Sequence, residues 1–95
     1  MTKVSIGVGG SPGLYVISVV AELVEVHPQT LRNYERAGLL DPSRSAGGTR
    51  RFSEADVKRI QRILELTAAG VNLEGVKRIL ELEARIASLE AEKSQ

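Results

Sequence analysis

Apolar residues recur at helical intervals along most of the chain. The first group has four members on one side of a short helix: Val19, Val20, Leu23 and Val24. The preceding run Tyr15-Val16-Ile17 favours a strand, and Ser18 is a residue type that caps helices. We therefore predict a short strand and then a first helix of about two turns.

A second short helix is predicted directly after a tight connection at residues 24–26. His27-Pro28 places proline at the first helical position, where its missing N–H costs nothing, and Gly38 stands where a left-handed residue ends a helix. Leu31 and Tyr34 share the inner face of this helix. Its other sides are polar and basic, with Gln29, Arg32, Asn33 and Arg36. Two short helices joined in this way form a helix-turn-helix pattern.

The stretch PSRSAGGTRRFS, residues 42–53, predicts a β-hairpin. Asp41-Pro42 and Gly47-Gly48 are turn signals, and Arg51-Phe52 resumes an extended segment. The two glycines are expected to supply the permissive backbone angles of the tip. A hairpin with an exposed tip beside a helix-turn-helix is a wing.

Two longer helices are predicted after the hairpin. Ser53 followed by Asp56 is a capping-box variant, and Gly70 ends the helix that starts there. The stripe expected to be buried comprises Val57, Ile60, Ile63, Leu64 and Thr67. Asn72 is placed to cap the fourth helix, whose apolar residues are Val76, Ile79, Leu82, Ile86 and Leu89. The last four have the alternating spacing of a heptad seam.

These elements predict a mostly α fold: a winged helix-turn-helix with a short β-hairpin wing and a C-terminal helix. Residues 1–14, rich in Gly and Ser, are expected to form a flexible tail, and residues 15–82 the winged domain. Residues 83–95 would form a helical extension. A chain of 95 residues suits one compact domain and leaves little room for a large enclosed pocket.

Positive charge is concentrated in one third of the chain. Residues 32–62 carry eight Lys or Arg against four acids, although the whole chain has a net charge of only +1. Such a local excess is typical of a surface that binds a polyanion. The alternative is a charged face that is exposed to solvent and has no binding partner, and the sequence alone does not distinguish the two.

Several classes of chemistry are excluded or unsupported. The chain has no cysteine, which excludes disulfides and thiolate sites and fits a reducing cytoplasm. His27 is the single histidine and has no second ligand near it in sequence, so we expect a cap or surface role and no metal site. We find no catalytic set and no nucleotide-binding glycine motif, and we therefore expect no cofactor and no enzyme activity.

The apolar residues near the N-terminus do not predict a membrane segment. Glycines and a proline interrupt residues 4–20 well short of about 20 continuous apolar residues, and the small-residue cleavage pattern of a signal peptide is missing. We therefore expect a cytoplasmic protein with no membrane partner.

The motifs TLRNYERAGLL (30–40) and GGTRRFSEADVKRI (47–60) resemble the MerR family of bacterial winged-helix transcription regulators. The matching groups follow one another in the family's order from about Tyr15 to Leu82. Within the family, YVISVVAEL, HPQTLRNYERAGL and GVNLEGVKRILELE are similar to the heat-shock repressor (HspR-like) group. That group has a polar residue and a tyrosine where other members have two aromatic residues, here Asn33-Tyr34.

The resemblance implies double-stranded DNA as the partner. With the helical pattern, it assigns the DNA contacts to Gln29, Thr30, Arg32, Asn33, Tyr34, Arg36, Arg44, Gly48, Arg50 and Arg51. Asn33 could recognise an adenine edge. We expect the ring of Tyr34 to pack beneath the helix with its hydroxyl at a phosphate. A mobile hairpin with scattered charge is the alternative for the wing.

The resemblance also implies a repressor of chaperone genes that uses a DnaK-like chaperone as co-repressor. We expect Val76 and Ile79 to complete the winged domain, and Leu82, Ile86 and Leu89 to form a weak homodimer that recognises an inverted repeat. No small-molecule effector is expected. The alternative function is an architectural or recombination-accessory module that acts through protein partners.

Overall fold

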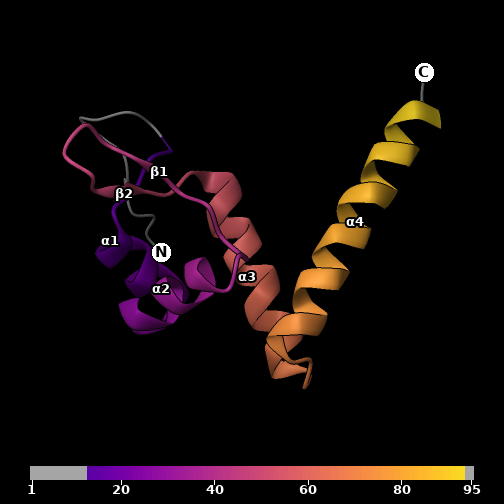
Figure 1. The fold of residues 1–95 in the computed structure, drawn as a ribbon, viewed down its shortest axis with the longest axis horizontal. Coiled ribbons are helices and arrows are strands. Elements are labelled where there is room, and N and C mark those ends of the chain that lie inside the picture. Colours follow the sequence, from indigo (N-terminus) through magenta and orange to yellow (C-terminus); the bar gives the residue numbers. More distant parts are fainter. Residues whose placement is uncertain (1–12, 94–95) are drawn as a thin grey trace, which may run out of the picture. The chain divides into compact units, whose positions relative to one another are not determined.

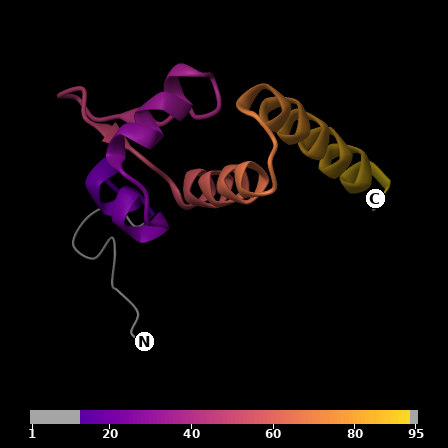
Figure 2. The same ribbon diagram turned by 90° about the horizontal axis from the view of Figure 1, so that it is seen from below.

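The computed structural model describes residues 13–93 and confirms the mostly α winged helix-turn-helix (Figures 1 and 2). The elements in order are α1 (Ile17–Val24), α2 (Pro28–Arg36), β1 (Ser43–Arg44), β2 (Arg50–Arg51), α3 (Glu54–Ala68) and α4 (Leu73–Lys93). The chain divides into two compact units, Met1–Arg62 and Ile63–Gln95. The predicted flexible tail lies outside the described residues except for Gly13 and Leu14.

Helix α1 starts one residue earlier than Ser18 and has no side-chain cap. Val16 is the N-cap in extended conformation, and its carbonyl already accepts hydrogen bonds from the amides of Val19 (3.1 Å) and Val20 (3.2 Å). The prediction of a Ser18 cap is therefore wrong, because Ser18 lies within the first turn. Of the predicted strand only Tyr15 is paired, through an antiparallel bridge to Phe52.

The buried face of α1 differs from the expected one by one position. Val20 and Ala21 are buried, whereas Val19 and Leu23 are 36% and 44% exposed. Alanine carries a weak periodicity signal, so a pattern drawn from large apolar residues shifts towards the exposed side. The helix ends where Glu25 adopts a left-handed conformation (φ 62°).

Helix α2 forms as its sequence signals predict. Pro28 occupies the first turn, and the Nδ1 atom of His27 accepts a hydrogen bond from the Gln29 amide at 2.9 Å. This confirms the cap role expected for His27. Gly38 has φ 83° just beyond the end of the helix, and Leu31 and Tyr34 are buried.

The wing is a short antiparallel hairpin in which Ser43 faces Arg51 and Arg44 faces Arg50. Its tip is closed by hydrogen bonds from the Ser45 amide to the Thr49 carbonyl (2.8 Å) and from the Gly48 amide to the Ser45 carbonyl (2.9 Å). Only Gly48 has a positive φ, 89°, so the expectation that both glycines supply special backbone angles is wrong for Gly47.

The first unit is held together where the wing ends and α3 begins. The Tyr15 amide donates to the Phe52 carbonyl at 2.8 Å, and the Phe52 amide donates to the Tyr15 carbonyl at 2.7 Å. The predicted capping box is present, with Ser53 amide to Asp56 Oδ2 at 2.8 Å and Asp56 amide to Ser53 Oγ at 3.0 Å. The buried apolar residues of this unit include Tyr15, Val20, Ala21, Leu31, Tyr34, Leu39, Leu40, Phe52, Val57 and Ile60.

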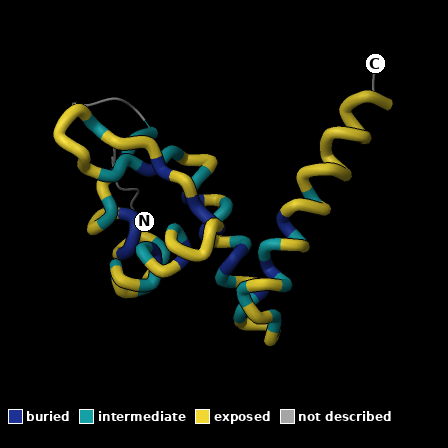
Figure 3. Tube along the Cα trace, viewed as in Figure 1, coloured by how far each residue is buried: buried dark blue, intermediate teal, exposed yellow. Residues whose placement is uncertain are grey.

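In the second unit, Ile63, Leu66, Val76 and Leu80 are buried. Leu66 replaces Leu64 and Thr67 of the predicted stripe, and Leu80 replaces Ile79; the three predicted residues are only partly covered. The Asn72 cap is confirmed, because its Oδ1 atom accepts from the Gly75 amide at 2.8 Å. Leu82, Ile86 and Leu89 remain exposed on α4. Figure 3 shows that exposed positions predominate along the C-terminal part of this helix.

The wing tip provides a matched pair of glycine substitutions. Gly48→Ala should destabilise the hairpin by about 1 kcal/mol, because a side chain at φ 89° is strained. Gly47→Ala should be tolerated, since an added methyl group meets no atom within 4 Å there and the backbone needs no positive φ. Amide hydrogen exchange across residues 45–49 measures the effect. Equal exchange in the two variants would contradict the assignment of the strain to Gly48.

Candidate nucleic-acid interface

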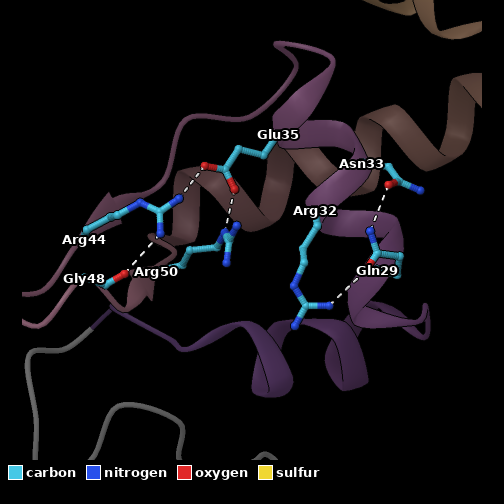
Figure 4. A network of polar contacts seen from close by, with 7 residues as sticks. All are labelled: Gln29, Arg32, Asn33, Glu35, Arg44, Gly48 and Arg50. Atoms are coloured by element: carbon cyan, nitrogen blue, oxygen red, sulfur yellow. Dashed lines mark hydrogen bonds and ion pairs between the residues drawn. The ribbon is translucent and has the colours of Figure 1, made fainter.

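Four of the predicted DNA contacts form one continuous polar surface on α2. Gln29, Arg32, Asn33 and Arg36 follow the helical repeat on the side opposite the buried Leu31 and Tyr34, and we call them the outward face of α2. Figure 4 shows three of them at close range. The structure therefore brings these predicted residues together.

Hydrogen bonds link the outward face of α2 from end to end. Arg32 Nη1 donates to Gln29 Oε1 at 3.3 Å, Gln29 Nε2 donates to Asn33 Oδ1 at 3.1 Å, and Arg36 Nη1 donates to the same Asn33 oxygen at 3.3 Å. All three bonds are at the surface, where exchange for another partner costs little. The face thus offers amide and guanidinium groups, the side chains that pair with base edges and phosphates.

The remaining two α2 residues of the predicted site lie elsewhere. Tyr34 is buried with 7% of its surface exposed, as expected for a ring that packs beneath the helix. Thr30 is half-buried, and its amide donates to the His27 carbonyl at 2.9 Å within the first turn. Neither belongs to the outward face of α2.

Glu35 is a site residue that the sequence analysis missed. Its Oε2 atom pairs with Arg44 Nη2 at 2.9 Å, and its Oε1 atom pairs with Arg50 Nε at 2.6 Å (Figure 4). Arg44 Nη1 also donates to the Gly48 carbonyl at 3.1 Å. We call Glu35, Arg44, Gly48 and Arg50 the wing cluster. It ties both strands of the wing to α2.

The carboxylate of Glu35 is charged in this setting. The hydrogen bond from Arg50 is the main cause that lowers the pKa of Glu35 below the ordinary value. Partial burial raises this pKa, but the charge of Arg50 and the contacts of Arg44 lower it further, so the net shift is downward. With two guanidinium groups and one carboxylate, the wing cluster keeps a net positive charge.

Arg51 stands apart from the wing cluster. Successive residues of a strand point to opposite faces, so Arg50 faces α2 and Arg51 does not. The Nε atom of Arg51 is buried without a hydrogen-bond partner, and the Arg51 carbonyl accepts from Ser43 Oγ at 3.2 Å. The structure therefore groups Arg44, Gly48 and Arg50 with α2 and separates Arg51 from them.

The described residues offer little for other chemistry. No group of three or more His, Cys, Asp or Glu side chains in residues 13–93 could hold a metal ion. Over the same residues, none of the helices is both apolar enough and long enough to cross a bilayer. A hollow on the first unit is lined by Tyr15, Leu23, Glu54, Val57, Lys58 and Gln61, and the Tyr15 hydroxyl donates to Glu54 Oε2 at 3.1 Å beside it.

Known proteins resemble the chain in sequence over most of its length. A candidate heat shock protein HspR of Streptomyces coelicolor is 47% identical over 79 residues, which cover 82% of this chain and 52% of that protein. The regulator MlrA of Escherichia coli is 44% identical over 71 residues, 74% of this chain and 29% of MlrA. The chain therefore spans about half or less of the length of these relatives.

Two solved structures are similar to this chain in fold. HiNmlR, a MerR-family regulator without a sensor domain, was solved bound to promoter DNA; it superposes with a TM-score of 0.69 at 28% identity, over 85% of this chain and 68% of that one. The N-terminal part of the Bacillus subtilis multidrug transporter activator, MtaN, gives 0.67 at 30% identity, over 84% and 85%.

The sequence model described as the MerR HTH family regulatory protein matches residues 15–83, which include the outward face of α2 and the whole wing cluster. The proteins compared above are regulators or are named for the heat-shock response, and none is described as an enzyme. The chain belongs to the MerR family of DNA-binding helix-turn-helix transcription regulators.

Proposed function

We propose that this chain is a sequence-specific repressor of heat-shock and chaperone genes that acts on DNA in the cytoplasm. The ion-paired wing cluster carries the proposal, because it joins a basic wing to the helix whose outward face is polar. Similarity to a candidate HspR supports the heat-shock assignment.

In the proposed complex, α2 enters the major groove. Gln29, Arg32 and Asn33 contact base edges, with Asn33 suited to adenine, and Thr30 lies at the groove edge. Arg36 and the Tyr34 hydroxyl reach phosphates. The wing contacts the flanking backbone through its arginines, and the absence of a side chain at Gly48 permits a close approach.

We propose further that residues 15–82 act as the DNA-binding domain and that residues 83–95, of which the structure describes 83–93 as the end of α4, serve in dimerisation. Leu82, Ile86 and Leu89 are 53–59% exposed, and exposure of large apolar side chains to water is unfavourable. Because the stripe covers only about two heptads, it supports a weak dimer. Such a dimer recognises an inverted repeat. The co-repressor would be a DnaK-like chaperone, and no small-molecule effector is required.

An architectural or recombination-accessory module is the second candidate, favoured by the exposed apolar stripe of α4, which suits a protein partner. Footprinting on the DNA selected by the chain separates the two functions. One protected inverted repeat supports the repressor, whereas diffuse protection with bending supports the module.

Arg32→Ala should remove the selected sequence motif. The loss of base and phosphate hydrogen bonds should weaken binding to DNA enriched from random oligonucleotides by about 10- to 100-fold. Arg78→Ala is the control, since Arg78 is exposed on α4 and its ion pair with Glu81 is long at 3.9 Å and exposed to solvent. The same motif enriched by wild type and Arg32→Ala would contradict the groove assignment of α2.

Arg50→Ala should reduce the salt dependence of DNA binding. Each phosphate contact releases counterions, so loss of one should lower the slope of log K against log salt by about one. Titrations by fluorescence anisotropy at several salt concentrations measure this slope. A slope equal to that of wild type would show that Arg50 makes no phosphate contact.

The double substitution Ile86→Ser and Leu89→Ser should abolish the dimer on DNA and leave the winged domain folded, because both side chains are exposed. Sedimentation velocity with a selected duplex should show one chain per duplex in place of two, while circular dichroism stays unchanged. Ala84→Ser, at an exposed position outside the apolar stripe, serves as the control. Two chains per duplex in the double variant would exclude this stripe as the dimer contact.

A further inference from the structure

Glu35 is an acid in a surface otherwise suited to bind an anion. It lies on α2 beside the outward face, and its carboxylate meets arginines from both strands of the wing. We propose that Glu35 is a positioning residue that fixes the wing against α2 and thereby sets the preference for a specific DNA site over arbitrary DNA. The inference rests on the DNA binding proposed above.

The contacts of Glu35 leave one arginine oriented and still available. Arg44 uses both terminal nitrogens, one on Glu35 and one on the Gly48 carbonyl. Arg50 is held through Nε alone, and its two terminal nitrogens make no hydrogen bond to any described residue. A guanidinium held by Nε presents its two terminal N–H groups along one edge, which matches two oxygens of a phosphate.

The position of Arg50 is therefore defined relative to α2. Without Glu35, the side chain of Arg50 and the two-residue strands of the wing would be free to sample many orientations. An arginine in many orientations still attracts any polyanion, but it contacts a particular phosphate only part of the time. Positioning thus matters for a site that engages α2 and the wing together.

The charge of Glu35 has an effect on DNA binding opposite to that of its positioning role. A carboxylate near DNA repels phosphates and offsets one of the two wing arginines, so its removal should strengthen binding to arbitrary duplexes. Positioning predicts that the same change weakens binding to the specific site. The two effects have opposite signs, which separates positioning from general electrostatics.

A purely structural role gives a third pattern. Ion pairs that are partly exposed contribute little to stability, and here the side-chain exposures are 23% for Glu35, 44% for Arg44 and 27% for Arg50. If Glu35 only stabilised the fold, a neutral variant would lose affinity for specific and arbitrary DNA by the same factor.

Glu35→Gln in the full chain tests the inference, because glutamine keeps the shape and removes the charge. The probes are the duplex enriched by the wild-type chain and a scrambled duplex of equal length. The Kd for the scrambled duplex divided by the Kd for the enriched duplex should fall by about tenfold, which is the scale of one lost charged hydrogen bond. The scrambled duplex itself should bind as well as before or better. Glu22→Gln removes an equal charge from the exposed face of α1 and should leave the ratio within about twofold.

A ratio unchanged in Glu35→Gln, or an equal loss on both duplexes, would overturn the inference. Amide exchange at residues 43–51 provides an arm that needs no DNA, and it should be faster in Glu35→Gln than in Glu22→Gln. Equal exchange in both variants would also overturn it. If wild type enriches no sequence at all, the proposed function fails, and the exchange result still decides whether Glu35 holds the wing.

Discussion

The backbone pairing of Tyr15 with Phe52 is the constraint on which the DNA-binding unit depends. Two short hydrogen bonds join Tyr15, two residues before α1, to Phe52, the residue after β2, and Phe52 is 1% exposed. This junction fixes the start of the helix-turn-helix, the end of the wing and the start of α3 at one place. Arg59 adds a second tie, because its Nε atom donates to the Leu39 carbonyl at 2.6 Å and so fixes the segment after α2 to α3.

Charge acts on a geometry that this packing has already set. The chain as a whole is nearly neutral, so long-range attraction alone would give a weak and unselective DNA-binding protein. The structure instead arranges a few basic groups around one acid, where every charge has a defined neighbour. Under the proposed function, selectivity among DNA sites would therefore depend on the arrangement of the wing cluster more than on net charge.

The sequence predicted helix ends and turns that have local signals, but it missed side-chain contacts between residues far apart in the chain. The caps at His27, Ser53 and Asn72 and the turn at Gly38 involve residues a few positions apart, so periodicity and turn chemistry were sufficient. Glu35 pairs across 9 and 15 residues, and its neighbours in sequence give no sign of either partner. Arg36 is adjacent to Glu35 in sequence, but its guanidinium donates to the side-chain oxygen of Asn33, so the nearest acid in sequence is not the partner in this hydrogen bond.

Helix α4 shows why a heptad pattern alone did not identify every buried residue. Val76 and Leu80 are four residues apart and buried, whereas Leu82, Ile86 and Leu89 follow an alternating spacing centred about a third of a turn away and are exposed. Ile79 lies between the two stripes and is half-buried, so it fits either pattern. Because the two stripes lie on different faces of α4, burial of Val76 and Leu80 leaves the second stripe exposed to solvent. The residues that hold α4 in its own unit are therefore distinct from the apolar residues that α4 leaves exposed.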